Sequence, residues 1–178
     1  MAYKGKVIDN AYTGEVLTFL ETAADTSGEY LKIKWKIPAT RAKTAEHVHA
    51  NNDEWYEVIS GTLTYSIDRK EATAVAGEKI FFPKGVKHQQ NNMGHEDLTF
   101  IYTCSPALDM ENLIETISYL SITGKVKNGN PSFLQSMFWL GNSKVKVYDA
   151  AMPITFQNML SFFLAPVGRI FGYKTLLR

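Results

Sequence analysis

The sequence has little of several features that mark particular classes of protein. It contains one cysteine, Cys104, so no disulfide can form within the chain. It carries 19 basic and 18 acidic residues and has no run of like charges. Proteins that bind nucleic acids usually cluster Lys and Arg on one surface. These shortages exclude an intrachain disulfide scaffold and give no sign of a nucleic-acid partner.

Long apolar runs are also scarce. The first ten residues, MAYKGKVIDN, lack the apolar stretch of a signal peptide, so with the lone cysteine we expect a cytoplasmic protein. Residues 152–172 hold a single charge, Arg169, but several polar side chains and Pro166 interrupt them. A spanning helix needs about 20 mostly apolar residues. We therefore expect no membrane span.

The first hundred residues predict an all-β domain. In residues 31–37, LKIKWKI, apolar and charged residues alternate strictly, which buries one face of a strand and exposes the other. Many short strands separated by turns that contain Gly and Pro indicate a β-sandwich or a barrel. Further strands are predicted at residues 15–21, 54–60, 63–67, 72–76, 78–82 and 98–102.

The pattern changes after Pro106. Asp109 is a candidate N-cap for a helix over residues 109–118, and Ser132 is expected to begin a second short helix that ends at Gly141. Between these helices, residues 124–131 are rich in turn-forming residues.

The last segment has apolar residues at helical spacing, which predicts an amphipathic helix that bends or breaks at Pro166. We expect this apolar stripe to be buried against the barrel or a dimer partner, and less readily to form a lid over the barrel mouth. The sequence thus predicts a β-domain over residues 1–108 and a helical extension over residues 109–178 that packs on the barrel or on a dimer partner.

What the sequence does contain is a group of candidate metal ligands. Only four histidines occur, and two of them, His47 and His49, are one residue apart. On a strand, residues i and i+2 share a face, so both imidazoles can point into one interior. A hairpin after residues 50–53 can return the Glu54 carboxylate beside them, and His88 can come from a neighbouring strand. The pattern predicts one mononuclear metal site.

The chemistry of this ligand set narrows the choice of metal. Three imidazoles and one carboxylate suit Fe(II), Mn(II), Ni(II), Zn(II) or Co(II), and a cysteine-rich structural zinc site is excluded. Coordination positions would stay open for water, dioxygen or a chelating substrate. Tyr56 shares the strand face of Glu54 and Gln90 shares that of His88, so both are candidates for the lining of the cavity.

Other reactive residues have simpler explanations. His95 lies in a predicted turn and is interpreted as a surface histidine. Glu57 points to the face opposite Glu54, and Cys104, Trp35 and Tyr65 are interpreted as core residues.

These residues lie in two motifs that resemble those of the cupin family. The first motif is His-x-His, three or four residues, Glu, six residues and Gly; the second is Gly, five residues, Pro-x-Gly, two residues, His, three residues and Asn. One departure is Arg41, which stands where the family usually has a glycine before the first histidine. The strand pattern extends the likeness to residues 10–105. The matching positions are His47, His49, Glu54 and Gly61, then Gly77, Pro83, Gly85, His88 and Asn92.

The resemblance implies a mainly β fold, a double-stranded β-helix or jelly-roll barrel that holds one divalent metal, here followed by C-terminal α-helices. It implies His47, His49, Glu54 and His88 as ligands, and a homodimer. It also makes dioxygenase-like chemistry on a small molecule the leading hypothesis for an activity. Two alternatives stay open: a non-catalytic binding or sensing module, and a metal-independent sugar isomerase or epimerase with a His base and a Tyr acid. No general base, substrate or metal identity follows from the sequence.

Overall fold

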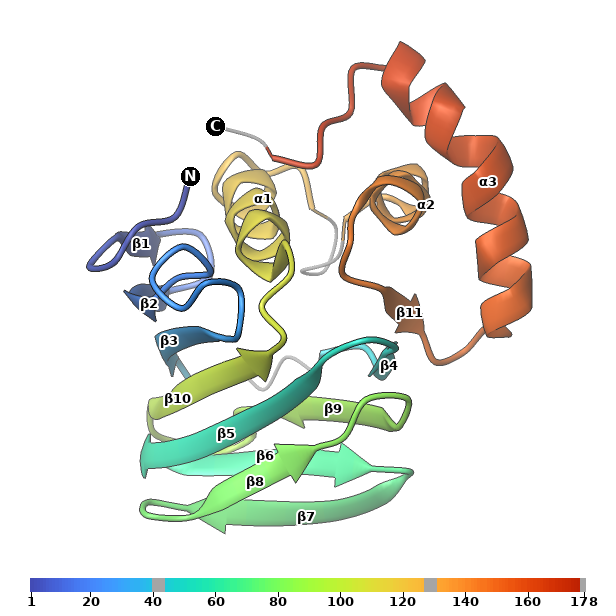
Figure 1. Cartoon of the computed structure of the whole chain (residues 1–178). Coiled ribbons are helices and arrows are strands. Elements are labelled where there is room, and N and C mark those ends of the chain that lie inside the picture. The colour runs from blue at the N-terminus through green and yellow to red at the C-terminus, as the bar shows by residue number, and fades with distance from the viewer. Residues whose placement is uncertain (40–43, 127–130, 177–178) are drawn as a thin grey trace.

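The fold consists of two antiparallel sheets that face each other, with three helices gathered at one end (Figure 1). The computed structural model of the chain describes residues 1–39, 44–126 and 131–176. The first sheet has the order β1-β2-β3-β10-β5-β8 and the second has the order β11-β4-β9-β6-β7. The elements are β1 (Val7–Asn10), β2 (Glu15–Glu21), β3 (Leu31–Ile37), β4 (His47–His49), β5 (Asp53–Ser60), β6 (Thr62–Ile67), β7 (Lys70–Val75), β8 (Lys79–Phe82), β9 (Lys87–Asn91), β10 (Leu98–Ser105), α1 (Met110–Ile122), α2 (Phe133–Asn142), β11 (Val147–Asp149) and α3 (Ile154–Ile170).

The alternating segments form strands with one buried face, as the sequence predicts. In β3, Leu31 and Ile33 are fully buried while Lys34 is exposed, and in β10 every second residue is buried. β10 lies between β3 and β5, so its buried side chains fill the space between the two sheets. The mainly β architecture with C-terminal helices is therefore confirmed.

Two strands, β1 and β11, are additional to the prediction, and β11 bears on function. β11 lies inside the segment predicted to be helical, and it pairs with β4 in the register Val147↔His49 and Asp149↔His47. The loop after β4 is tied to the same segment, because the Ala50 backbone N–H donates to the Lys146 carbonyl at 2.9 Å. The extension thus completes the edge of the sheet that carries two of the candidate ligands.

Asp109 has a different role from the predicted one. It occupies the N-cap position of α1, but its side chain caps nothing there. Its carboxylate instead accepts hydrogen bonds from the backbone N–H groups of Lys144 at 2.8 Å and Val145 at 2.7 Å. The predicted start of the second helix is correct, since Ser132 is the N-cap of α2 and its hydroxyl accepts from the Gln135 N–H at 3.3 Å. Asp109 therefore fixes the segment that leads into β11.

α3 is a continuous helix to Ile170, so the break expected at Pro166 does not occur. Proline removes one backbone donor and leaves the carbonyl of Phe162 without its helical partner. Both residues are exposed on the outer side of the helix, where water can bond that carbonyl. No helix among the described residues is both long and apolar enough to cross a membrane.

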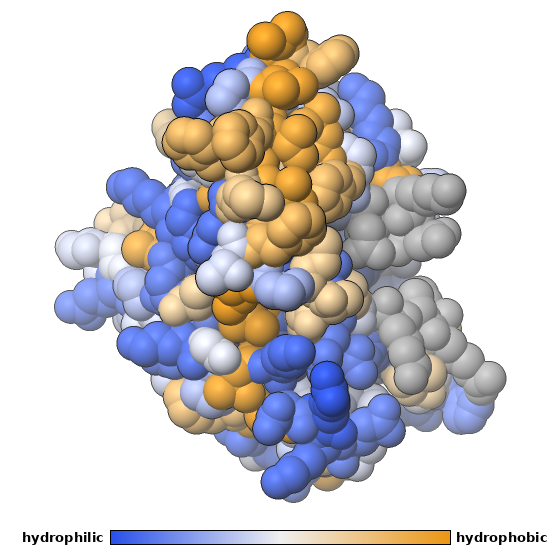
Figure 2. All heavy atoms as spheres, turned by 90° about the vertical axis from the view of Figure 1, so that its right-hand side faces the viewer, coloured by the Kyte–Doolittle hydropathy of each residue, from blue (hydrophilic) through white to orange (hydrophobic). Residues whose placement is uncertain are grey.

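The face of α3 that packs on α2 is made of small and polar residues. A Cβ on Gly141 of α2 would lie 2.6 Å from the Ala165 Cβ, and a Cβ on Gly168 would lie 2.9 Å from Phe138. The helices approach closely where these glycines lie, and Leu160 and Leu164 of α3 pack beside this contact against the cluster of Met137 and Leu140. The remaining large apolar residues, among them Phe162, Phe163 and Ile170, are exposed, and orange spheres form a vertical band over this helix in Figure 2.

Two sequence features lie outside the described residues. They are Arg41, which replaces the family glycine, and residues 127–130 of the turn-rich segment. The boundary between residues 108 and 109 stays a prediction, with the addition that β11 belongs to the second sheet.

Gly61, the last residue of the first motif, offers a direct test of the fold. Its φ is +80°, and a Cβ there would lie 2.5 Å from the Asp97 carbonyl oxygen, whereas Gly77 has φ +90° with nothing within 4 Å. Both Ala variants incur the cost of a left-handed backbone, about 1–2 kcal/mol. We expect Gly61→Ala to lower the free energy of unfolding by at least about 1 kcal/mol more than Gly77→Ala, because only Gly61 adds a backbone clash. Urea denaturation of both variants measures the difference, and equal losses would contradict it.

Candidate metal centre

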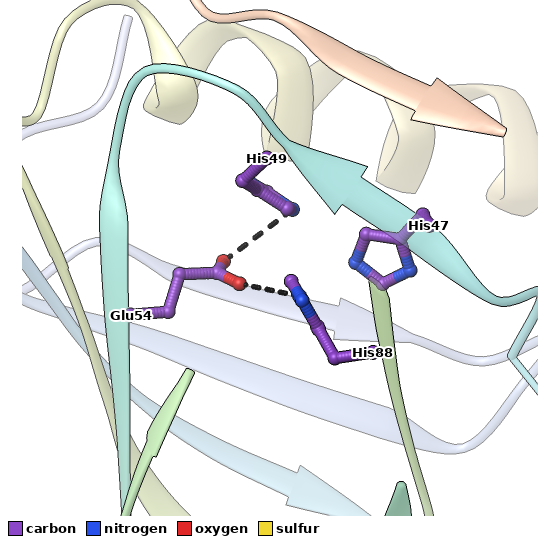
Figure 3. Close-up of side chains that lie close together, drawn as sticks. All are labelled: His47, His49, Glu54 and His88. Atoms are coloured by element: carbon purple, nitrogen blue, oxygen red, sulfur yellow. Dashed lines mark hydrogen bonds and ion pairs between the residues drawn. The ribbon is translucent and has the colours of Figure 1, made fainter. Parts of the chain in front are cut away.

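The four predicted ligands meet between the two sheets. His47 and His49 come from β4 and His88 from β9, where it lies directly opposite His47 in the strand register. Glu54 comes from β5 in the other sheet. One ligand atom from each residue lies within 4.8 Å of the others. Figure 3 shows the Glu54 carboxylate pointing toward the imidazoles of His49 and His88, with the His47 ring beside them.

Both oxygens of the Glu54 carboxylate lie close to polar partners. Its Oε2 lies 2.9 Å from His88 Nε2, and its Oε1 lies 3.5 Å from His49 Nε2. Oε1 also accepts a hydrogen bond from the Tyr102 hydroxyl at 2.5 Å. Glu54 and His88 are almost completely buried. A buried carboxylate is tolerated only with such partners.

Backbone carbonyls set the tautomers of two imidazoles. His47 Nδ1 lies 2.9 Å from the Ala45 carbonyl oxygen, and His88 Nδ1 lies 2.9 Å from that of Val86. A carbonyl accepts, so each Nδ1 carries the proton and each Nε2 of the neutral ring presents its lone pair. Metal-binding histidines usually have this outer hydrogen bond, which orients the ring and raises its basicity. Both rings are therefore prepared as Nε2 ligands.

This arrangement needs a cation at its centre. With Nδ1–H directed at Val86, a neutral His88 turns its Nε2 lone pair toward a carboxylate oxygen only 2.9 Å away. Two acceptors at this distance repel each other unless a proton or a metal ion lies with them. Three imidazoles and one carboxylate match the ligand set of a borderline divalent ion, so the residues present fit the metal that the sequence predicts.

Burial sets the protonation state of the cluster. Burial, reinforced by the neighbouring His49 and His88, lowers the pKa of His47 to about 3, and burial also lowers the pKa of His49. Burial alone would raise the pKa of the Glu54 carboxyl, but His49 and His88 outweigh it and hold that pKa at about 2. Burial raises the pKa of Tyr102 well above its usual value, so its phenol keeps the proton that it donates to Glu54. His47, His49 and Glu54 are thus unprotonated near neutral pH.

The two sequence motifs are joined at this site by hydrogen bonds. The Gly85 N–H in the Pro-x-Gly turn donates to the His49 carbonyl at 2.7 Å. The neighbouring Lys84 N–H donates to Asp53 Oδ1 at 2.8 Å. The last motif residue, Asn92, donates from its amide to the carbonyls of Ile37 at 3.0 Å and Glu96 at 2.8 Å.

A cavity of about 600 Å³ lies over the ligands. His47, His49 and Glu54 form part of its wall, and the predicted lining residues Tyr56 and Gln90 do so too. The opposite wall comes from α1, α2 and the segment around β11. We call this space the chamber. Pockets of 300–1,000 Å³ bind most small ligands and cofactors.

Three residues near the ligands were not identified from the sequence as part of the site. Tyr102 donates to Glu54, and the Asn52 side chain lies 3.3–3.4 Å from His49 Nδ1. Trp35, predicted to be core, lines the chamber. The strand faces of Trp35 and Tyr102 are readable from the alternation of β3 and β10, whereas Asn52 lies in the loop between β4 and β5. Contact with Glu54 and His49 depends on strand order and loop path, which local patterns do not give.

The remaining sequence interpretations agree with the structure. His95 is exposed in a bend, and Glu57 is exposed on β5. Cys104 is fully buried, and burial raises the pKa of its thiol to about 12. It therefore has the character of a core residue.

Acidification should destabilise the metal-free protein. In the folded protein the pKa values of His47 and His49 lie below the ordinary value of 6.5. Below pH 6.5 the unfolded chain therefore binds protons that the folded protein does not, and the folded state loses stability as the pH falls. Between pH 7.5 and 5.5 we expect a loss of about 1–2 kcal/mol from these groups. Urea unfolding in the presence of a chelator measures it. His47→Gln should show a smaller pH dependence, and His95→Gln the full one; an unchanged dependence in His47→Gln would contradict the assignment.

Comparisons with known proteins agree with this geometry. A search of the curated proteins finds no sequence match. KdgF from Halomonas sp. aligns with 60% of this chain and 92% of its own, at 16% identity and a TM-score of 0.51. A structure described as a predicted oxalate decarboxylase, from Thermotoga maritima, aligns with 60% of this chain and 99% of its own, at 20% identity and a TM-score of 0.50. At these identities the likeness shows the fold alone.

The sequence match is to the cupin domain family and covers residues 34–104. This range contains both motifs and all four candidate ligands. Residues 34–104 match the cupin domain family, and the two sheets that contain them have the cupin fold.

Proposed function

We propose that the chain is a divalent-metal-dependent cupin enzyme that converts a small molecule bound in the chamber. His47, His49, Glu54 and His88 would hold the ion. The observation that carries the proposal is the convergence of their ligand atoms within 4.8 Å, with two of the imidazoles oriented by backbone carbonyls. Fe(II), Mn(II), Ni(II), Zn(II) and Co(II) all suit this set.

The reaction that we propose is dioxygenase-like. A bound ion of this type supplies Lewis acidity and, if it is redox-active, oxygen activation at its open positions. The chain's own residues would do the rest. The chamber holds the substrate beside the ligands and restricts the access of water. The Tyr102 hydroxyl keeps its proton and donates it in a hydrogen bond to the Glu54 carboxylate, which holds Glu54 in a fixed orientation.

Of the other two hypotheses, the metal-independent isomerase is less well supported by the site. A metal-independent sugar isomerase needs a free His base and a free Tyr acid. Here the three buried or half-buried histidines are gathered around one carboxylate, and the Tyr102 hydroxyl is bonded to it. A non-catalytic binding module would use the same chamber and metal. It differs from an enzyme only in the absence of turnover.

Metal analysis tests the centre directly. We expect purified wild-type protein to contain about one transition-metal ion per chain, as a four-ligand site holds a single ion. His49→Ala removes one ligand, and we expect its metal content to fall by at least about tenfold after the same dialysis. His95→Ala, a histidine outside the cluster, is the matched control and should keep its metal. Equal metal in wild type and His49→Ala, by elemental analysis, would refute the proposed centre.

We also propose that the chain is cytoplasmic and forms a homodimer through the outer face of α3. Phe162 is 75% exposed, Phe163 64% and Ile170 84%, and in the adjoining turn Phe171 is 70% exposed. Patches of this kind on soluble proteins usually mark interaction sites. A two-fold axis would place identical apolar faces together, which is the commonest arrangement in homo-oligomers.

Light scattering after size exclusion tests the dimer. We expect wild type to elute as a dimer, because separation would expose these aromatic rings. The double variant Phe162→Ser, Phe163→Ser should weaken association by at least about tenfold, since burying each ring stabilises by about 1.5–3 kcal/mol. Tyr12→Ser, which removes a 69% exposed ring elsewhere, is the control. A monomeric wild type at high concentration would contradict the proposal.

A further inference from the structure

We propose that the chamber selects a mainly apolar small molecule, uncharged or cationic beyond its metal-binding end, and discriminates against molecules that carry a second anionic group. This inference rests on the proposed metal centre, because one end of the ligand is placed at the ion. The four metal-binding residues leave open the chemistry of the part of the small molecule that lies away from the ion, and the chamber wall specifies it.

Apolar side chains from the helical extension dominate the wall that faces the ligands. They are contributed by both α1 and α2, so the substrate-facing surface is distinct from the cupin motifs. Apolar pockets gain affinity roughly in proportion to the apolar area they bury. The main apolar residues of this wall are Leu113, Ile114, Ile117, Phe133, Met137 and Leu140.

The charged side chains in the described lining of the chamber, the metal-binding histidines apart, are all of one sign. Its described lining contains three carboxylates, Glu46, Glu54 and Asp149, and neither Lys nor Arg. A divalent ion would compensate Glu54 and one anionic chelating end of a ligand. A second anionic group would then be desolvated without a cationic partner and near Glu46 or Asp149, which is strongly unfavourable. Sugar acids and dicarboxylic acids fit this wall poorly.

Two buried polar atoms indicate what else the ligand offers. Trp35 Nε1, a donor, and Gln90 Oε1, an acceptor, have no hydrogen-bond partner in the described part of the chain, and both residues line the chamber. Unpaired buried polar atoms are costly, and native proteins satisfy nearly all of them. Both atoms are closed off from solvent, so a neutral hydroxyl or carbonyl group on the ligand can bond them once their side chains turn toward the chamber.

A matched series of hydroxamic acids tests the selectivity on the full-length protein loaded with Co(II). All members share one chelating end, and the visible absorption of the bound Co(II) reports binding at the metal only. The series is benzohydroxamic acid, 4-tert-butylbenzohydroxamic acid and 4-carboxybenzohydroxamic acid. We expect the tert-butyl compound to bind at least roughly tenfold tighter than the parent. The carboxy compound should bind at least roughly tenfold weaker than the parent.

Variants of the wall formed by α1 and α2 show whether the chamber causes this order of binding affinities. Leu113→Lys places a cation in the wall, so it should weaken the tert-butyl compound and strengthen the carboxy compound, each by at least roughly fivefold. Phe133→Lys is the second variant, because Phe133 is 51% exposed and tolerates a lysine without loss of the fold. Val75→Lys, at a 52% exposed position of β7, adds the same single charge far from the α1 and α2 wall (Figure 1) and should leave the order of affinities unchanged.

The outcomes separate the two proposals. A protein that takes up no Co(II) would overturn the metal centre, and this inference with it. Normal Co(II) uptake with the carboxy compound bound as tightly as the tert-butyl compound would overturn the selectivity alone. Tight binding of the tert-butyl compound that is unchanged in both Leu113→Lys and Phe133→Lys would also overturn it.

Discussion

The Glu54 carboxylate is the group on which the candidate site depends. It comes from the first sheet, while the three imidazoles come from the second, so its contacts with His49 and His88 join the two sheets at the open end of the sandwich. A carboxylate this deeply buried is unfavourable unless donors or cations surround it. Tyr102 supplies one donor, and a metal ion would compensate the charge. The cluster is therefore both a candidate metal centre and a contact that joins the two sheets.

The helical extension turns a ligand set into a chamber. Residues 34–104, which match the cupin domain family, provide the four ligands, yet most of the apolar wall opposite them belongs to α1 and α2. This extension is held in place by polar contacts at the site itself. β11 pairs with the ligand strand β4, and Asp109 binds the backbone that leads into β11. Because ligand strand and chamber wall are hydrogen-bonded to each other, a change in one is expected to affect the other.

Helix α3 shows how packing can override a simple amphipathic pattern. Its large apolar residues were expected to be buried, but at Gly141 and Gly168 the helices come so close that α3 contributes only small side chains there, and Phe162, Phe163 and Ile170 stay exposed. The small residues are therefore inside and the aromatic ones outside (Figure 2). A burial prediction from hydrophobicity alone misses this, because it takes no account of the distance between helices. The exposed stripe instead supports an interaction surface.

The sequence by itself determined the mainly β fold, the helical tail and the identity of all four candidate ligands. It could do so because these signals are local: strand alternation, the shared face of His47 and His49, and the spacing of Glu54 and His88 around short turns. Tertiary structure alone decided that Tyr102 bonds Glu54, that Asp109 binds the 144–145 backbone and that β11 joins β4. It also decided that the chamber is apolar and lacks cationic side chains among its described residues. These features depend on strand order and on the distance between elements that are far apart in the sequence. A local pattern of side chains encodes neither the strand order nor that distance.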